Sequence, residues 1–312
     1  MITTSSSVAT ANIPTLEQVK ELVKLVERHA NQEQLCKTKI SGLHLSRFSN
    51  TTEPNFYIHQ TNVCFIIQGR KQITIGKDTY TYDPLTCLVA SVNLPAIGQI
   101  LEATPDKPYF SISLSVQPED LASLILETGQ HQFQLKKDNS QVLHVSQITT
   151  SLADALIRLL KLLDLKDQEM QIIAPLVIRE ISFRLLQTEQ FGSLTQVAMG
   201  HGNLHRISCA IAWIKQNLST SLRVKDLAKQ VNMSVSGLHH QFKAVTSLSP
   251  LQFQKKLRLQ EARNLLMTDK TCIAKIAYQV GYESPSQFSR EYTRLFGQSP
   301  LRDANRLRKG SL

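Results

Sequence analysis

The last third of the chain contains the same helical pattern twice, about 50 residues apart, and this repeat constrains the fold more than any other feature. Residues 226–231 read DLAKQV and residues 275–280 read KIAYQV, and each run is followed by a short turn and a longer amphipathic segment. Alanine occupies the same place in both first segments, at Ala228 and Ala277, where two helices that cross steeply need a small side chain. Each copy is therefore predicted to be a helix-turn-helix unit.

The longer segment of each copy has the signals of a capped helix with one buried face. Ser234 and Ser284 stand where a side-chain oxygen caps the free amides of a helix, and Pro285 follows at the first helical position. Apolar side chains at helical spacing are predicted to be buried: Leu238, Phe242, Val245, Phe288, Tyr292 and Leu295. The opposite faces carry Ser236, Gly237, His239, His240, Lys243, Ser286, Gln287, Ser289, Arg290 and Arg294. These polar, small or basic residues are typical of a helix that enters the major groove of DNA.

The charge of the chain favours a polyanion as the partner of this region. Residues 205–312 hold 18 Lys and Arg against 6 Asp and Glu, whereas residues 1–204 hold 17 against 19, so the whole excess of +10 lies in the last third. A predicted helix over 251–267, roughly 25 Å long, separates the two units. Two units so spaced can address neighbouring major-groove segments. A helical solenoid is the alternative, but two copies are too few for one.

The middle of the chain has a different character. Residues 57–116 contain short runs rich in β-branched and aromatic residues, with turn residues between them, which predicts an antiparallel sandwich or barrel. Within residues 63–68, Val63, Phe65 and Ile67 are predicted to share one face, with Cys64, Ile66 and Gln68 on the other.

Helical patterns follow the strands. Pro118 opens one helix, Ser151 begins another, and residues 171–187 continue with Pro175 inside. The last two helices either close the β unit or contact a second copy of the chain, and we favour the dimer contact. Residues 190–204 contain three glycines and no strong period, so we interpret them as a linker. These glycines also argue against a helical metal site at His201 and His205.

The cysteines and the termini bear on the cellular compartment. Five scattered cysteines without CxxC spacing are typical of reduced thiols in the cytoplasm and argue against structural zinc. Cys64 and Cys87 lie in neighbouring predicted strands, either as a reactive thiol pair or, more commonly for such residues, as small buried hydrophobes. The chain has no apolar run of 18 residues, and its start has no secretory pattern.

Residues 277–300, AYQVGYESPSQFSREYTRLFGQSP, resemble the C-terminal signature of the AraC/XylS family of bacterial transcription regulators, and residues 211–266 resemble its preceding half. Residues 64–100 resemble the N-terminal effector domain of one subgroup. The resemblance implies a multidomain α+β protein, with a cupin-like antiparallel β barrel and helical extension before an all-α domain of two helix-turn-helix units. The expected boundaries are 1–189 for the effector and dimerisation domain, 190–204 for the linker and 205–308 for the DNA-binding domain.

The resemblance also implies roles for the exposed residues of the second helices. The base-reading candidates are Ser236, Gly237, His239, His240, Ser286, Gln287, Ser289 and Arg290, and the phosphate candidates are Lys243, Arg294, Arg302 and Arg306. Two departures stand out. Gly237 lies inside a recognition helix, where it costs up to about 1 kcal/mol relative to Ala. The last helix reads SPLRDANRLR, without the Tyr-Arg pair that many members carry after the proline.

The expected function is sequence-specific DNA binding under the control of an unidentified small-molecule effector, without a cofactor or an enzymatic activity. The expected partners are double-stranded DNA, the effector, a second copy of the chain and RNA polymerase. One alternative is a cupin-fold enzyme with a nucleic-acid tether. It is disfavoured because the histidines around the β region, His44, His59, His131 and His144, form no HxH cluster, and hydrolase and P-loop motifs are missing. A third hypothesis is an architectural DNA-bending protein without an effector.

Overall fold

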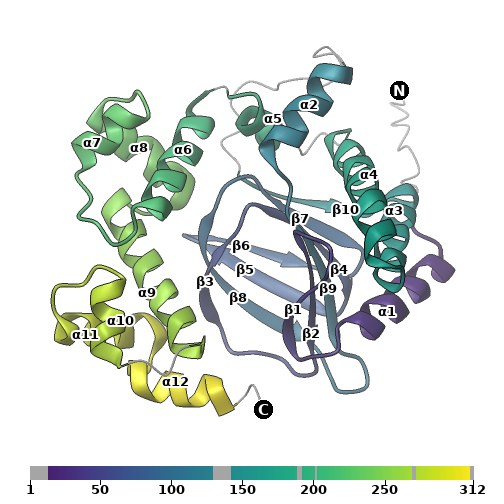
Figure 1. Ribbon diagram of the computed structural model, residues 1–312, viewed down its shortest axis with the longest axis horizontal. Helices are drawn as coiled ribbons and strands as arrows, with labels where there is room; N and C mark the ends of the chain where they lie inside the picture. Colours follow the sequence, from purple (N-terminus) through teal and green to yellow (C-terminus); the bar gives the residue numbers. More distant parts are fainter. Residues whose placement is uncertain (1–12, 129–141, 188–191, 201, 269–271, 310–312) are drawn as a thin grey trace, which may run out of the picture.

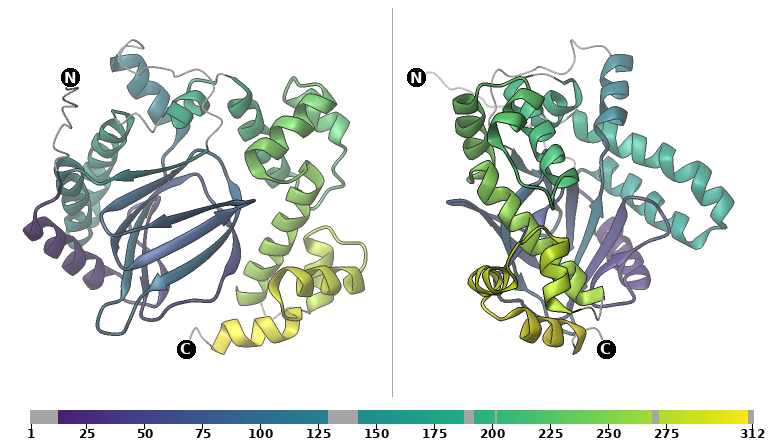
Figure 2. Two further views of the ribbon diagram at one scale, coloured as in Figure 1. Left: turned by 180° about the vertical axis from the view of Figure 1, so that it is seen from behind. Right: turned by 60° about the vertical axis from the view of Figure 1, so that its left-hand side comes forward.

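The computed structural model of the protein describes residues 13–128, 142–187, 192–200, 202–268 and 272–309. A central β domain separates two groups of helices (Figure 1 and Figure 2). One group contains α1 (Leu16–His29), α3 (Thr150–Lys161) and α4 (Asp167–Leu186), and the other runs from α6 to α12. Among the described helices, none is both long and apolar enough to cross a bilayer.

The β domain consists of two antiparallel sheets, as the strand pattern predicted. The six-stranded sheet has the order β1 (Gln34–Lys37), β2 (Leu43–Phe48), β9 (Tyr109–Leu114), β4 (Asn62–Gln68), β7 (Thr86–Ala90) and β10 (Leu143–Gln147). The four-stranded sheet has the order β3 (Asn55–His59), β8 (Leu94–Glu102), β5 (Arg70–Ile75) and β6 (Asp78–Tyr82). Strand β3 therefore lies at an edge of its sheet, where it pairs with β8 alone.

Strand β4 alternates between two cores. Val63, Phe65 and Ile67 lie in the core beneath the helices, whereas Cys64 and Ile66 lie in a second core with residues of the four-stranded sheet. The alternation predicted from the sequence is confirmed. Because successive side chains of a strand point to opposite faces, one strand can build both cores.

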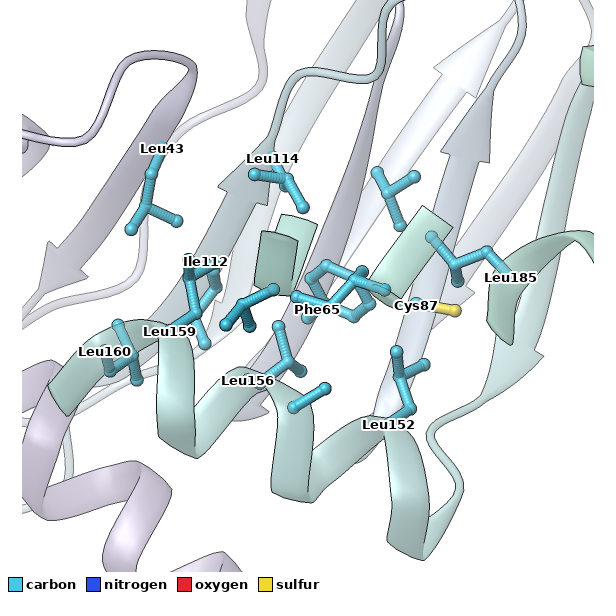
Figure 3. Close-up of a cluster of buried hydrophobic side chains, with 14 of the residues drawn as sticks. Leu43, Phe65, Cys87, Ile112, Leu114, Leu152, Leu156, Leu159, Leu160 and Leu185 are labelled. Atoms are coloured by element: carbon cyan, nitrogen blue, oxygen red, sulfur yellow. The ribbon is translucent and has the colours of Figure 1, made fainter. Parts of the chain in front are cut away.

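Helix α3 covers the six-stranded sheet. Its buried leucines, which include Leu156 and Leu159, pack on Phe65 and Ile112 of the sheet (Figure 3). For α3 the favoured prediction of a dimer contact was therefore wrong, and the helix closes the β unit. Helix α4 packs on α3 and on α2 (Pro118–Thr128), but it leaves large apolar side chains exposed.

The predicted linker contains regular structure. Helix α5 (Gly192–Ala198) and the start of α6 (Gly202–Gln216) occupy it. Leu194 of α5 is buried in the core of the β domain, and Val197 is buried with the first helix-turn-helix unit. The sequence shows no strong period here because so short a helix as α5 buries too few side chains to produce one.

The C-terminal group of helices contains the two predicted units. The first unit is α7 (Val224–Gln230) and α8 (Val235–Thr246), and the second is α10 (Ile273–Gln279) and α11 (Pro285–Phe296). Helix α9 (Pro250–Thr268) lies between them, and α12 (Pro300–Lys309) follows. The turns match in detail: the Met233 amide donates to Ala228 O at 2.9 Å, and the Tyr282 amide donates to Ala277 O at the same distance. The repeat in sequence is thus a repeat in structure.

Arg258 of α9 fixes the two units relative to each other. Its guanidinium donates hydrogen bonds to Leu218 O at 2.7 Å and Thr220 O at 2.7 Å, in the loop before α7. A third bond, of 2.8 Å, reaches Gly281 O in the turn of the second unit. The planar, charged fork of an arginine suits this task because it holds several carbonyls in one geometry.

A buried carboxylate organises the second unit. Asp303 of α12 is fully buried and accepts from Arg263 Nε at 2.9 Å, from the Tyr292 hydroxyl at 2.9 Å and from Arg306 at 3.0 Å. Burial, and then the neighbouring Asp303 carboxylate, raise the pKa of Tyr292, which keeps it a hydrogen-bond donor. Arg263 also donates to Asn55 Oδ1 at 2.6 Å, so the same side chain joins the second unit to strand β3.

We expect Gly281→Ala to destabilise the full-length protein more than Gly297→Ala. Both glycines have a positive φ, of 89° and 75°, where an L residue costs about 1–2 kcal/mol. Only at Gly281 would the added Cβ also collide with backbone, because it would lie 2.4 Å from Ser219 O; nothing lies within 4 Å at Gly297. Denaturant unfolding of the two variants measures the difference. Equal losses would mean that the contact with Ser219 relaxes without cost.

Candidate nucleic-acid interface

Both recognition helices begin with the serine cap that the sequence predicted. Ser234 Oγ accepts the Gly237 amide at 3.1 Å, and Ser284 Oγ accepts the Gln287 amide at 3.3 Å. Pro285 occupies the first turn of α11, where its missing N–H has no intrahelical partner to lose. The caps fix the start of each helix, which is the part that a groove-reading helix presents to base edges.

Gly237 has a structural reason to be glycine. A Cβ at this position would lie 2.9 Å from Ser234 Oγ, the atom that caps the helix. Glycine therefore preserves the cap of α8, at the helical cost noted above. This reason comes from within the protein and requires no contact between Gly237 and DNA.

The outer faces of α8 and α11 are open to solvent, as predicted. On α8, Ser236, His239, His240 and Lys243 are exposed and Gly237 is half-buried; on α11, Ser286, Gln287, Arg290 and Arg294 are exposed and Ser289 is half-buried. The inner faces carry the core: Leu238, Phe242, Phe288 and Tyr292 are fully buried, Val245 is buried and Leu295 is half-buried. Whether the outer residues contact bases stays a prediction.

The charges on these faces are not all equally available. Within the described part of the chain, Arg290 and Lys243 make no ion pair. Gln287 donates to Glu291 Oε1 at 3.3 Å, and Lys255 and Tyr282 bind the same carboxylate at 2.8 and 2.9 Å. Burial alone would raise the pKa of Glu291, but these hydrogen bonds outweigh it and lower the pKa, so the carboxylate is charged at neutral pH. Reading a base with Gln287 would require it to leave Glu291.

The two arginines predicted on the last helix differ in the same way. Arg302 is exposed. Arg306 has 57% of its side chain exposed, yet it pairs with the buried Asp303 at 3.0 Å. Arg302 is thus the freer of the two for a phosphate contact.

The β domain contacts both recognition helices at their C-terminal ends. Ser247, the C-cap of α8, packs so closely on Gly76 that a Cβ there would lie 2.2 Å from its hydroxyl. Phe296, the last residue of α11, meets Phe56 of β3 edge to face at 6.4 Å, and Lys256 Nζ lies 4.8 Å from the same Phe56 ring. The contact leaves the N-terminal halves of both helices uncovered.

The proposed thiol pair in the β domain is ruled out by the strand register. Cys64 is paired with Leu88 and Ser113, whereas Cys87 is paired with Phe65, so the two sulfurs point to opposite faces of one sheet. Burial raises the pKa of Cys64, and it raises that of Cys87 to about 12. Both are small buried hydrophobes. His131 and His201, two of the residues weighed as metal ligands, lie outside the described residues.

Sequence reasoning missed the side chains that hold the interface in place. Arg258 and Gln254 donate hydrogen bonds to backbone carbonyls of the loop before α7, with Gln254 donating to Thr220 O at 2.9 Å. Arg263 donates to the buried carboxylate of Asp303. Their only signal was the occurrence of polar residues between the apolar positions of α9, which is equally typical of a solvated helix.

Two family models match the chain in the order that the domains follow. The model of the AraC-type transcriptional regulator N-terminus matches residues 39–193, and a helix-turn-helix domain matches residues 227–306. The HTH-type transcriptional activator RhaS of Escherichia coli (strain SE11) is 33% identical over 107 residues, which is 34% of this chain. The match spans 38% of the length of that relative.

The solved structures of ToxT from Vibrio cholerae share the two-domain fold. One of them aligns with a TM-score of 0.55 at 13% identity, covering 84% of this chain and 97% of ToxT. The structure of ToxT bound to an unsaturated fatty acid aligns with a TM-score of 0.52 at 12% identity, covering 86% and 96%. The matched domains, their order and the doubled helix-turn-helix place the chain in one family: it belongs to the AraC/XylS family of transcription regulators.

Proposed function

We propose that this protein is a sequence-specific DNA-binding transcription regulator that reads two adjacent major-groove segments. The observation that carries the proposal is the pair of equivalent helices, α8 and α11, whose capped N-terminal halves are exposed on the basic third of the chain. The eight base-reading candidates lie on these halves, and Lys243, Arg294, Arg302 and Arg306 are assigned to phosphates. Binding through phosphates releases counterions, so affinity falls steeply with salt.

We also propose that the β domain binds a small-molecule effector that controls DNA binding, without a catalytic step or a cofactor. The family membership supports this role, and ToxT, which has the same fold, is described as binding an unsaturated fatty acid. A regulator of this kind acts where the chromosome is, in the cytoplasm, and RNA polymerase is its further candidate partner.

Arg290→Ala tests base reading by α11. We expect it to weaken binding to the preferred DNA site by about 1–3 kcal/mol and to relax the preference at one base pair, because an arginine fork reads a guanine edge. The measurement is the affinity for the preferred site and for a shuffled duplex at one salt concentration. The matched control is Arg294→Ala, about one turn farther along α11, which should weaken binding to both duplexes alike. An equal loss on both duplexes for Arg290→Ala would make it a phosphate contact.

A homodimer is the oligomeric state that we propose, with α4 as its contact. Ile172 and Leu176 lie one turn apart on this helix and are 70% and 64% exposed. Helix α3 covers the sheet, so α4 is the helix of the pair that keeps an uncovered apolar stripe.

Leu176→Glu is expected to convert the dimer to a monomer, because a carboxylate buried in an apolar contact loses its hydration. Sedimentation of the full-length protein over a range of concentrations measures the state. The control is Leu301→Glu on α12, where the leucine is 58% exposed. A dimer that survives Leu176→Glu would exclude α4 as the contact.

A further inference from the structure

The space between the two sheets contains a polar cluster around one lysine. Lys71 of β5 is paired with Tyr82 of β6, so both side chains lie on the same face of the four-stranded sheet. Tyr57 of β3 lies on that face too, with Lys71 Nζ 5.3 Å from the centroid of its ring. Cys64 and Tyr109 face the cluster from the six-stranded sheet. The core here is not the apolar filling that a small barrel normally has.

The charge of Lys71 has no partner of opposite sign. Among the described residues, no carboxylate pairs with it. Burial lowers the pKa of Lys71, whereas the neighbouring Tyr57, Tyr109 and Cys64 raise it, and the net shift is upward. Lys71 is half-buried, and a charge removed even partly from water is destabilising unless a counter-charge is supplied.

The neighbours of Lys71 have unsatisfied polar atoms as well. The hydroxyls of Tyr57, Tyr82 and Tyr109 and Nε2 of His59 are buried without a hydrogen-bond partner. The Lys71 ammonium is near enough to Tyr57 to perturb its pKa, but no hydrogen bond of normal geometry joins the two. Burial, and then Lys71, lower the pKa of His59 to about 3, so its ring is neutral. Buried polar atoms in folded proteins nearly always have partners, and several orphans together require an explanation.

A pocket of about 250 Å³ reaches this cluster. Lys71, Tyr57 and Asn55 form its polar side, and Phe48 and Ile100 form its apolar side. Gly98 makes room for the Tyr57 ring, because a Cβ there would lie 2.6 Å from it. The volume is just below that of pockets for drug-sized ligands, which suits a small metabolite.

We propose that this Lys71 pocket binds a small organic carboxylate, with its carboxylate on Lys71 Nζ and the Tyr57 hydroxyl and its apolar part against Phe48 and Ile100. The inference rests on the proposed function, of which it names the effector class and site. The ligand would supply both the missing counter-charge and an acceptor for an orphan hydroxyl. Charge-assisted hydrogen bonds of this type are the stronger ones.

A second pocket, of about 470 Å³ between the domains, is less suited to an anion. Its lysine, Lys215, already donates to Gln60 Oε1 at 3.0 Å, and the Glu261 carboxylate lines the same space. Lys215→Met is therefore the matched control for Lys71→Met.

The test measures binding to the full-length protein by calorimetry and thermal unfolding, in the absence of DNA. The probes are butyrate, hexanoate and phenylacetate, each compared with its uncharged amide. We expect at least one carboxylate to bind and to raise the melting temperature while its amide does not. Lys71→Met should weaken that binding about tenfold or more, and Tyr57→Phe should weaken it several-fold, since each removes one hydrogen bond to the anion. Lys215→Met should leave it unchanged.

The stability of the empty protein provides a second readout. Lys71→Met removes the unpaired ammonium, so the empty variant should melt at the same temperature as the wild type or higher. The inference is overturned if no carboxylate binds, if the amides bind equally well, or if Lys215→Met rather than Lys71→Met abolishes binding. If the protein bound carboxylates but preferred no DNA sequence, the proposed regulatory function would be wrong, whereas the proposal of a carboxylate site at Lys71 would still hold.

Discussion

The buried carboxylate of Asp303 determines how the second half of the DNA-binding region is assembled. It accepts hydrogen bonds from side chains of α9, α11 and α12. Its negative charge is compensated by Arg263, which is itself nearly buried beside it. A buried pair of this kind adds little net stability, but loss of one partner strands the other. Its value here is geometric, since few other arrangements satisfy Asp303, Arg263 and Tyr292 together. Through Asn55, the same arginine extends that constraint to the β domain.

The two units are held to the β domain by different physical interactions. The first unit shares a continuous apolar core with the four-stranded sheet, in which Phe56, Ile58, Ile211 and Phe242 all take part. The second has a core of its own and meets the sheet through aromatic and cationic contacts at Phe56. Arg258 then joins the units directly. The reading surfaces are therefore preorganised, which lowers the entropy that DNA binding must offset.

The fold was predictable wherever local chemistry repeats. The doubled unit, the caps at Ser234 and Ser284 and the alternation in β4 all follow from spacing or from a side chain acting within one turn. Helix α5 and the opposite facing of Cys64 and Cys87 could not be predicted, because they depend on packing partners far along the chain. Strands β1 and β10 are too short for their sequences to show a detectable alternation, so neither β10 nor the pairing of β1 with β2 was predicted. The polar cluster at Lys71 was invisible for the same reason: its members come from five strands and share no motif.

Strand β3 has consequences beyond its place at the edge of a sheet. Tyr57 faces the Lys71 pocket, while Phe56 and Ile58 on the alternate positions face the DNA-binding helices. Asn55 touches both, because it lines the pocket and accepts a hydrogen bond from Arg263. Within its sheet this strand pairs with β8 alone, so it can tilt more readily than a central strand. If a ligand and a DNA duplex favour different tilts of β3, the binding of each changes the affinity for the other through one coupling free energy. If the Lys71 pocket binds the proposed effector, thermodynamic linkage requires that DNA binding change the affinity for the effector by the same factor as the effector changes the affinity for DNA.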